Sequence, residues 1–154
     1  MKDNLDKVKL LARDLRDGKE YPRSLRETLG GYVLAARALD KCRAALVGWQ
    51  GDYHSNCPLD QTWLKFVEID YAAFRLFVAS GATDDEVAVW IGEHAKKRTR
   101  ADIVAWNNRQ RDAHLSDLSP EIQEHMEDYI VDSVPRNRVV YHWFDVYDLE
   151  EERL

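Results

Sequence analysis

Several features that would mark particular protein classes are scarce in this chain of 154 residues. Its two cysteines, Cys42 and Cys57, are too few for a disulfide-rich secreted scaffold, and free thiols fit a reducing compartment. No apolar run reaches the ~18 residues that a membrane-spanning helix requires. The first residues are charged and lack the apolar segment of a secretory signal peptide. These absences predict a cytoplasmic protein without a membrane partner.

Positive charge is also in short supply. The chain has 22 Lys and Arg residues against 28 Asp and Glu residues, which gives a formal net charge of −6. A broad nucleic-acid footprint needs a basic face, so no nucleic-acid partner is predicted. With 45% hydrophobic and 32% charged residues, the composition is that of an ordinary globular protein long enough to bury a core.

Apolar residues recur at helical spacing along most of the chain. The spacing predicts helices from Leu5 to Leu15, from about Leu29 to Leu46, and from Leu59 to Phe66. Later helices are indicated by residues typical of helix starts, including a capping box and a serine followed by proline. These starts are Asp70, Thr83 with Glu86, Thr99, and Ser119 with Pro120.

Two segments depart from this pattern. Residues 48–58 (GWQGDYHSNCP) contain two glycines, an asparagine and a proline, and are expected to form an irregular loop. The aromatic tail from Val139 to Leu149 must pack on the body of the protein or on a second subunit. The sequence therefore predicts an all-α fold: a single compact domain over residues 1–154, a helical bundle of six to eight helices without a sheet.

Five short strings resemble a known family. They are Pro22-Arg23-Ser24, Leu29-Gly30-Gly31-Tyr32, Arg37 to Ala44 (RALDKCRA), Gly51-Asp52-Tyr53-His54, and Cys57-Pro58-Leu59-Asp60. Together they resemble the bacterial family known as domain of unknown function 5069, and the similarity covers most of the chain. Leu25 stands where a proline is expected, a minor departure. The resemblance implies a shared fold and carries no catalytic roles.

Chemically versatile side chains are concentrated around the 48–58 loop. His54 can act as a general acid or base near neutral pH, and Cys57 is a candidate nucleophile. Asp60 could orient the imidazole, and Tyr53 could assist. These four residues are the candidate catalytic group.

The helix before the loop supplies the candidate ligand-binding group. Arg43 could bind a carboxylate or phosphate through two hydrogen bonds, with Lys41 and Asp40 beside it. Trp49, in the loop, could line a pocket. We therefore expect a site for a small anionic metabolite around residues 48–60, and the sequence does not decide whether the protein is an enzyme.

Most of these residues also have a structural interpretation. Arg43 could form a structural salt bridge with Asp60 or Asp40. Tyr53, His54 and Cys57 could be packing residues, and Asp60 could be the N-cap of the next helix. Arg37, Asp40 and Lys41 could form a solvated helix face with local ion pairs, whereas Cys42 lies on the apolar face and is expected to be core.

Metal binding and assembly complete the set of alternatives. A metal could use His54, Cys57 and Asp60 with one of the other histidines, His94, His114, His125 or His142. No histidine pair has the i, i+4 spacing of a helical metal site, so neither a metal nor another cofactor is predicted. The alternative function is a non-catalytic interaction module or homodimer that uses the aromatic tail.

Overall fold

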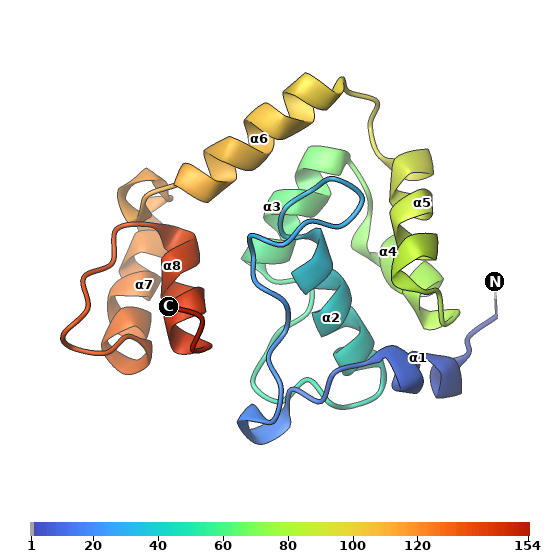
Figure 1. Ribbon diagram of the computed structural model, residues 1–154, viewed down its shortest axis with the longest axis horizontal. Coiled ribbons are helices and arrows are strands. Elements are labelled where there is room, and N and C mark those ends of the chain that lie inside the picture. The colour runs from blue at the N-terminus through green and yellow to red at the C-terminus, as the bar shows by residue number, and fades with distance from the viewer. Residues whose placement is uncertain (1) are drawn as a thin grey trace. The chain divides into compact units, whose positions relative to one another are not determined.

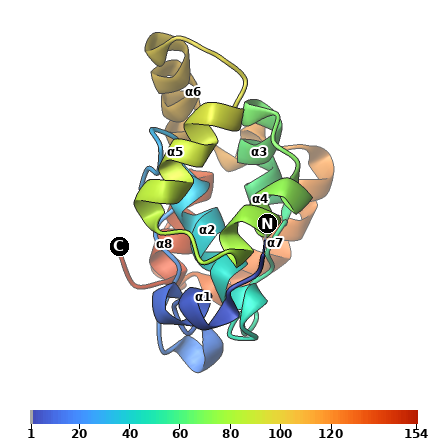
Figure 2. The ribbon, with the colours of Figure 1, turned by 90° about the vertical axis from the view of Figure 1, so that its right-hand side faces the viewer.

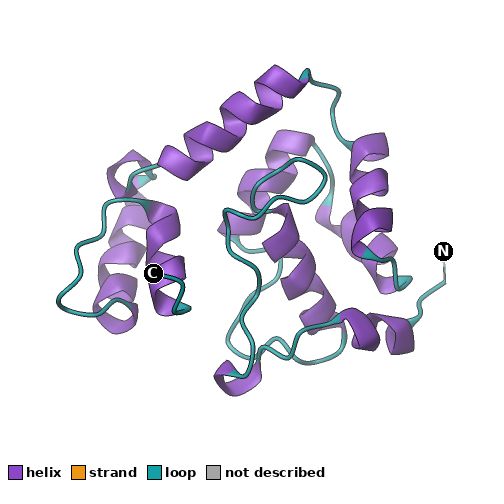
Figure 3. Cartoon of the chain, in the orientation of Figure 1, coloured by secondary structure: helices purple, strands orange, loops and turns teal. Residues whose placement is uncertain are grey.

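The computed structural model describes residues 2–154, and among these residues it contains eight α-helices and no strands (Figure 1, Figure 3). The first five helices are α1 (Leu5–Leu11), α2 (Ala35–Leu46), α3 (Pro58–Val67), α4 (Tyr71–Ala79) and α5 (Asp84–His94). The last three are α6 (Arg100–Asp112), α7 (Pro120–Ser133) and α8 (Trp143–Glu150). The predicted all-α class and the helix number are confirmed.

Contacts within the chain divide it into two compact units. Unit 1 runs to Arg100 and contains α1 to α5, and unit 2 comprises Ala101–Leu154. In unit 1, α2 packs against α1, α3 and α4 (Figure 2). In unit 2, α7 packs against α8 and against a short 3-10 turn, η2 (Leu115–Asp117).

The predicted capping residues explain where two helices begin. The Thr83 hydroxyl accepts the Glu86 N–H at 3.2 Å, and the Glu86 carboxylate accepts the Thr83 N–H at 3.0 Å. This reciprocal pair confirms the predicted capping box at the start of α5. Ser119 likewise caps α7, with Pro120 at its first position.

The predicted start of the second helix is wrong. The structure begins α2 at Ala35, because Gly30 and Gly31 adopt positive φ angles of +60° and +91° that a right-handed helix cannot include. Leu29 and Tyr32 exchange two backbone hydrogen bonds of 3.1 Å across these glycines. The segment is therefore a tight turn. The first helix also ends early, at Leu11.

The aromatic tail contributes to the core of unit 2. In α8, the side chains of Trp143, Phe144, Val146 and Leu149 are buried within the chain itself. The Tyr147 hydroxyl lies 3.8 Å from the Met126 sulfur on α7. Of the two packing partners that the sequence left open, the structure supplies the body of the protein.

Helix α2 is buried on every side. Each residue from Ala35 to Ala44 is buried, including Arg37, Asp40, Lys41 and Arg43 at 3–4% exposure. The interpretation of Arg37, Asp40 and Lys41 as a solvated face is therefore wrong. Buried charges are costly unless they are paired, and α2 pairs three of its own with other segments: Asp40 with Arg23, Lys41 with Asp60, and Arg43 with Asp84.

The loop after α2 depends on close backbone packing at Gly51. Gly51 has φ +56°, and a Cβ atom there would lie 2.6 Å from the Leu15 carbonyl oxygen. Gly48 has φ +76°, but a Cβ atom there would meet nothing within 4 Å. We expect Gly48→Ala to cost about 1 kcal/mol for the left-handed conformation, and Gly51→Ala roughly 3 kcal/mol or more because backbone must also move. Urea unfolding of both variants measures the difference, and equal costs would contradict it.

Removing one partner of the buried Lys41–Asp60 pair should be strongly destabilising. Lys41→Met leaves the Asp60 carboxylate buried without its cation, so we expect a loss of about 3–5 kcal/mol in the free energy of unfolding. The double variant Lys41→Met with Asp60→Leu should recover most of this loss. The exposed Lys96–Glu68 pair is the matched control, and Lys96→Met should cost less than about 1 kcal/mol. If the double variant is no more stable than Lys41→Met, the loss of stability does not come from leaving Asp60 without its cation, and the prediction is wrong.

Candidate functional site

The residues predicted to form one site lie on different sides of α2. Side chains on an α-helix rotate by about 100° per residue, so Lys41 and Arg43 point about 200° apart. Lys41 points toward α3, where it meets Asp60, and Arg43 points toward the start of α5, where it meets Asp84. The predicted constellation is therefore divided into two clusters.

The first cluster joins Lys41, Cys57 and Asp60. The buried Lys41 ammonium donates to Asp60 Oδ1 at 2.9 Å and to Cys57 Sγ at 3.1 Å. Asp60 Oδ2 accepts the Asn56 N–H at 2.8 Å, which ties the end of the loop to α3. Cys57 is the N-cap residue of α3, so the alternative interpretation of Asp60 as the N-cap is wrong. Asp60 lies inside the first turn, where a carboxylate is favoured by the helix dipole.

The two aromatic candidates of the loop stand apart from this sulfur. His54 is exposed, and among residues 2–154 it makes no hydrogen bond, ion pair or ring contact. Tyr53 is partly buried, and the Arg37 guanidinium lies 5.6 Å from the centre of its ring. The structure therefore joins Cys57 to Lys41 rather than to His54.

The second cluster surrounds the Asp84 carboxylate. Arg23 Nη1 donates to Asp84 Oδ2 at 2.8 Å, and Arg43 Nη1 donates to Asp84 Oδ1 at 2.8 Å. Arg23 also binds Asp40, with 2.9 Å between Nη2 and Oδ1 and 3.0 Å between Nε and Oδ2. Arg43 completes its bonding by donating from Nη2 to the Ala82 carbonyl at 2.9 Å.

These arginines border an open pocket of about 360 Å³. We call it the arginine pocket, and its lining residues are Leu11, Arg13, Arg23, Asp40, Arg43, Thr83, Asp84 and Asp85. Arg13 lies at its exposed side, with its Nε 3.7 Å from Asp40 Oδ2. Two of the predicted ligand-binding residues, Arg43 and Asp40, therefore share one pocket, and sequence reasoning missed Arg13 and Arg23 because they lie in irregular segments before α2.

Charge pairing in the arginine pocket shifts the pKa values of Asp84 and Arg23. Partial burial opposes ionisation of Asp84, but hydrogen bonds from Arg43 and Arg23 outweigh it and lower the pKa of Asp84 below its ordinary value. For Arg23, burial likewise opposes the charged form, but Asp40 and Asp84 raise the pKa of the guanidinium. Both groups are thus held in their charged forms at neutral pH.

Trp49 anchors the loop against the segment that follows α1. Its backbone N–H donates to the Ala44 carbonyl at 2.8 Å, and its backbone carbonyl accepts the Leu15 N–H at 2.9 Å. The cationic groups of Lys9 and Arg16 lie 5.4 and 5.6 Å from the centre of its ring. These contacts are cation–π in geometry and explain the ring's position.

Cys42 is a core residue, as its place on the apolar helix face predicted. Its side chain is fully buried, and this burial raises the pKa of the thiol to about 12. The Tyr71 hydroxyl lies 4.0 Å from its sulfur and 2.5 Å from the Ser55 hydroxyl. A thiol held protonated in this way is a poor nucleophile.

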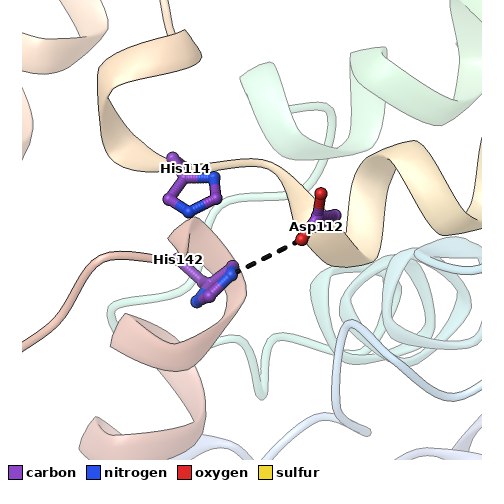
Figure 4. Close-up of side chains that lie close together, drawn as sticks. All are labelled: Asp112, His114 and His142. Carbon is purple, nitrogen blue, oxygen red and sulfur yellow. Dashed lines mark ion pairs between the residues drawn. The ribbon is translucent and has the colours of Figure 1, made fainter.

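A third cluster, in unit 2, brings together Asp112, His114 and His142 (Figure 4). One potential ligand atom from each residue lies within 4.8 Å of the other two. Sequence reasoning named both histidines but did not pair them, because they are far apart in the chain and lack helical spacing. His54, Cys57 and Asp60 form no such group within residues 2–154.

No helix within residues 2–154 is both long and apolar enough to cross a membrane.

A search of curated proteins found no match. The model of one protein family, described as Domain of unknown function (DUF5069), matches residues 19–153. That match covers the loop, α2, both clusters of unit 1 and all but the last residue of unit 2. It confirms the resemblance in the sequence strings. The chain therefore belongs to the DUF5069 family.

Proposed function

We propose that this protein binds a small anionic molecule, through a carboxylate or phosphate group, in the arginine pocket. The observation that carries the proposal is the convergence of Arg23 and Arg43 on both oxygens of one carboxylate, at 2.8 Å each. Two guanidinium groups aimed at one anionic group form the arrangement by which proteins recognise carboxylates and phosphates. In the free protein, the Asp84 side chain takes the place of that anionic group.

Asp84 is suited to exchange with a ligand. Its side chain is 44% exposed, whereas those of Asp40 and Arg43 are almost completely buried. A rotation of Asp84 into solvent would leave two guanidinium N–H groups facing the pocket, while Asp40 would continue to hold Arg23. The ligand then replaces one charge-assisted pair with another, so the arginines are never buried without a counter-charge.

The first cluster supports a chemical role for Cys57 more than for His54. The Lys41 ammonium lies 3.1 Å from the Cys57 sulfur, whereas the His54 side chain has no partner within residues 2–154. Catalytic roles for Cys57, His54, Tyr53 and Asp60, with Lys41 and Trp49 as ligand contacts, stay predictions, as does the site around residues 48–60 as a whole. The arginine pocket is the proposed binding site for which the geometry gives the stronger support.

The Asp84→Asn variant tests the exchange, with inorganic phosphate as the probe. Removal of the competing carboxylate should raise the affinity for phosphate about tenfold, since an exposed charge-assisted pair contributes on the order of 1 kcal/mol. Titration calorimetry at low ionic strength provides the measurement. Asp85→Asn is the matched control, because this substitution removes the same charge from the lining of the same pocket. The Asp85 side chain makes no bond to Arg23 or Arg43, which both bind Asp84.

Two results would count against the proposal. If Asp84→Asn and Asp85→Asn raise the affinity equally, the effect is one of net charge and the arginine pair is not a site. If neither variant binds phosphate at millimolar concentrations, the network is structural. Circular dichroism of both variants checks that α5 retains its helix, whose capping box does not involve either residue.

A second candidate function is a non-catalytic interaction module or homodimer. What supports it is the apolar surface before α8, where the side chains of Val139 and Tyr141 are 75% and 67% exposed. If this surface joins two copies, Tyr141→Lys should shift a dimer to monomers in sedimentation equilibrium without loss of helix content. A wild-type chain that is monomeric at all concentrations would contradict it.

The cellular setting is part of the same proposal. The acidic net charge supports the absence of a nucleic-acid partner. The two unpaired cysteines support a cytoplasmic location.

A further inference from the structure

The histidine cluster of unit 2 is formed by backbone pairing. His114 and His142 form an isolated antiparallel β-bridge. The Leu115 N–H donates to the Tyr141 carbonyl at 2.7 Å, and the Trp143 N–H donates to the Ala113 carbonyl at 3.0 Å. These bonds flank the two histidines, which makes them a non-hydrogen-bonded pair, the kind in which opposite side chains lie closest and on the same face.

This pairing brings the two imidazole rings close together. Their centres lie 4.5 Å apart and their planes are inclined by 38°. Helix α6 ends at Asp112, two residues before His114, and places a carboxylate beside them, with 3.7 Å between Asp112 Oδ1 and His142 Nε2 (Figure 4). Two nitrogen donors and one oxygen donor thus converge on one side of the bridge.

A carboxylate also lies near the Nδ1 atom of each imidazole. Asp117 Oδ2 lies 3.7 Å from His114 Nδ1, and Asp145 Oδ2 lies 3.6 Å from His142 Nδ1. Asp117 is itself held in place, because its Oδ2 accepts the His114 N–H at 2.9 Å. Histidines that bind metals usually present one nitrogen to the ion and the other to a carboxylate, which orients the ring and raises its basicity. In His142 this arrangement leaves Nε2, the nitrogen that faces Asp112, for an ion.

We propose that Asp112, His114 and His142 bind a divalent transition-metal ion such as Zn²⁺. The ligand set of two imidazoles and one carboxylate suits Zn²⁺ and its neighbours in the first transition series, and three protein ligands leave a position for water or another ligand. Bonds of ~2.0–2.1 Å in a tetrahedral site place ligand atoms about 3.3 Å apart, so the present group must contract. Asp112, whose side chain is 81% exposed, is free to move inward.

The surroundings of the cluster favour a cation. Three carboxylates, on Asp112, Asp117 and Asp145, lie within 4 Å of the two imidazoles. His114 also borders a pocket of about 260 Å³ in unit 2, with Met126 and Tyr141 among its lining residues. A molecule in that pocket would lie next to one of the metal ligands. The proposal is independent of the arginine pocket, which belongs to unit 1.

Titration of the full chain with ZnCl₂ tests the site. Calorimetry should give one ion per chain with a micromolar or tighter dissociation constant, and His142→Ala should weaken it at least a hundredfold. Asp145→Asn, which leaves all three ligands in place, should weaken it about tenfold because it releases the ring of His142. His125→Ala, an exposed histidine of α7 outside the cluster, is the matched control and should change nothing.

The Asp112→Ala variant separates a metal ligand from a structural residue. Asp112 is the last residue of α6, where negative charge is unfavourable to the helix dipole. The variant should therefore lose affinity for Zn²⁺ while the metal-free protein keeps or raises its melting temperature. Lack of Zn²⁺ binding to the wild-type chain would overturn the proposal. Binding that survives both His142→Ala and Asp112→Ala would also overturn it, since the ion would then be held elsewhere.

Discussion

The organisation of unit 1 depends on the pairing of three charges that α2 carries into the protein interior. Asp40 binds Arg23 in the segment before the helix, Lys41 binds Asp60 on α3, and Arg43 binds Asp84 at the start of α5. Each pair joins α2 to a different part of the chain, so this one helix fixes the positions of the segment before it, of α3 and of α5. Because an unpaired buried charge costs several kcal/mol, an arrangement that breaks any of these pairs is disfavoured. Apolar residues would bury as well but would not discriminate between partners in this way.

The same requirement decides where function can be added. Lys41 and Asp60 are almost completely buried, so their pairing serves the fold. The more accessible member of this cluster is Cys57, which is partly buried and whose sulfur contacts the Lys41 ammonium. Asp84 is the exception among the acidic partners, because its side chain is nearly half exposed. A pair with one buried and one accessible member can exchange the accessible member for a ligand without leaving a charge unpaired. This asymmetry distinguishes the arginine pocket from the Lys41 cluster, although both contain the residue types expected of a site.

The sequence was sufficient where structure is determined locally. Helix periodicity, the Thr83 capping box and Ser119-Pro120 predicted helices that the structure contains, since their signals lie within one or two turns. It was insufficient where partners are distant: nothing near Asp40 or Arg43 in the sequence identifies Arg23 or Asp84 as the partner. The helical spacing of apolar residues also could not show that the polar side of α2 is buried, because that spacing reveals the contrast between the two faces and not what covers each face. The start of α2 failed for a local reason, the left-handed turn at Gly30 and Gly31.

Residues that violate local rules can be sorted by whether the fold compensates them. Helix α2 violates the expectation that charges face solvent, but each of its three paired charges has a partner within 3 Å, so the violation is explained by structure. Asp112 violates the preference for positive charge at a helix C-terminus, and within residues 2–154 its ion-pair partner is His142, at 3.7 Å, which attracts it only when protonated. No lysine or arginine within residues 2–154 forms an ion pair with this carboxylate. Such uncompensated conflicts between local preference and fold are expected at functional sites. A bound cation would reverse the conflict at Asp112, because its positive charge would lie at the C-terminus of α6, where the helix dipole favours it.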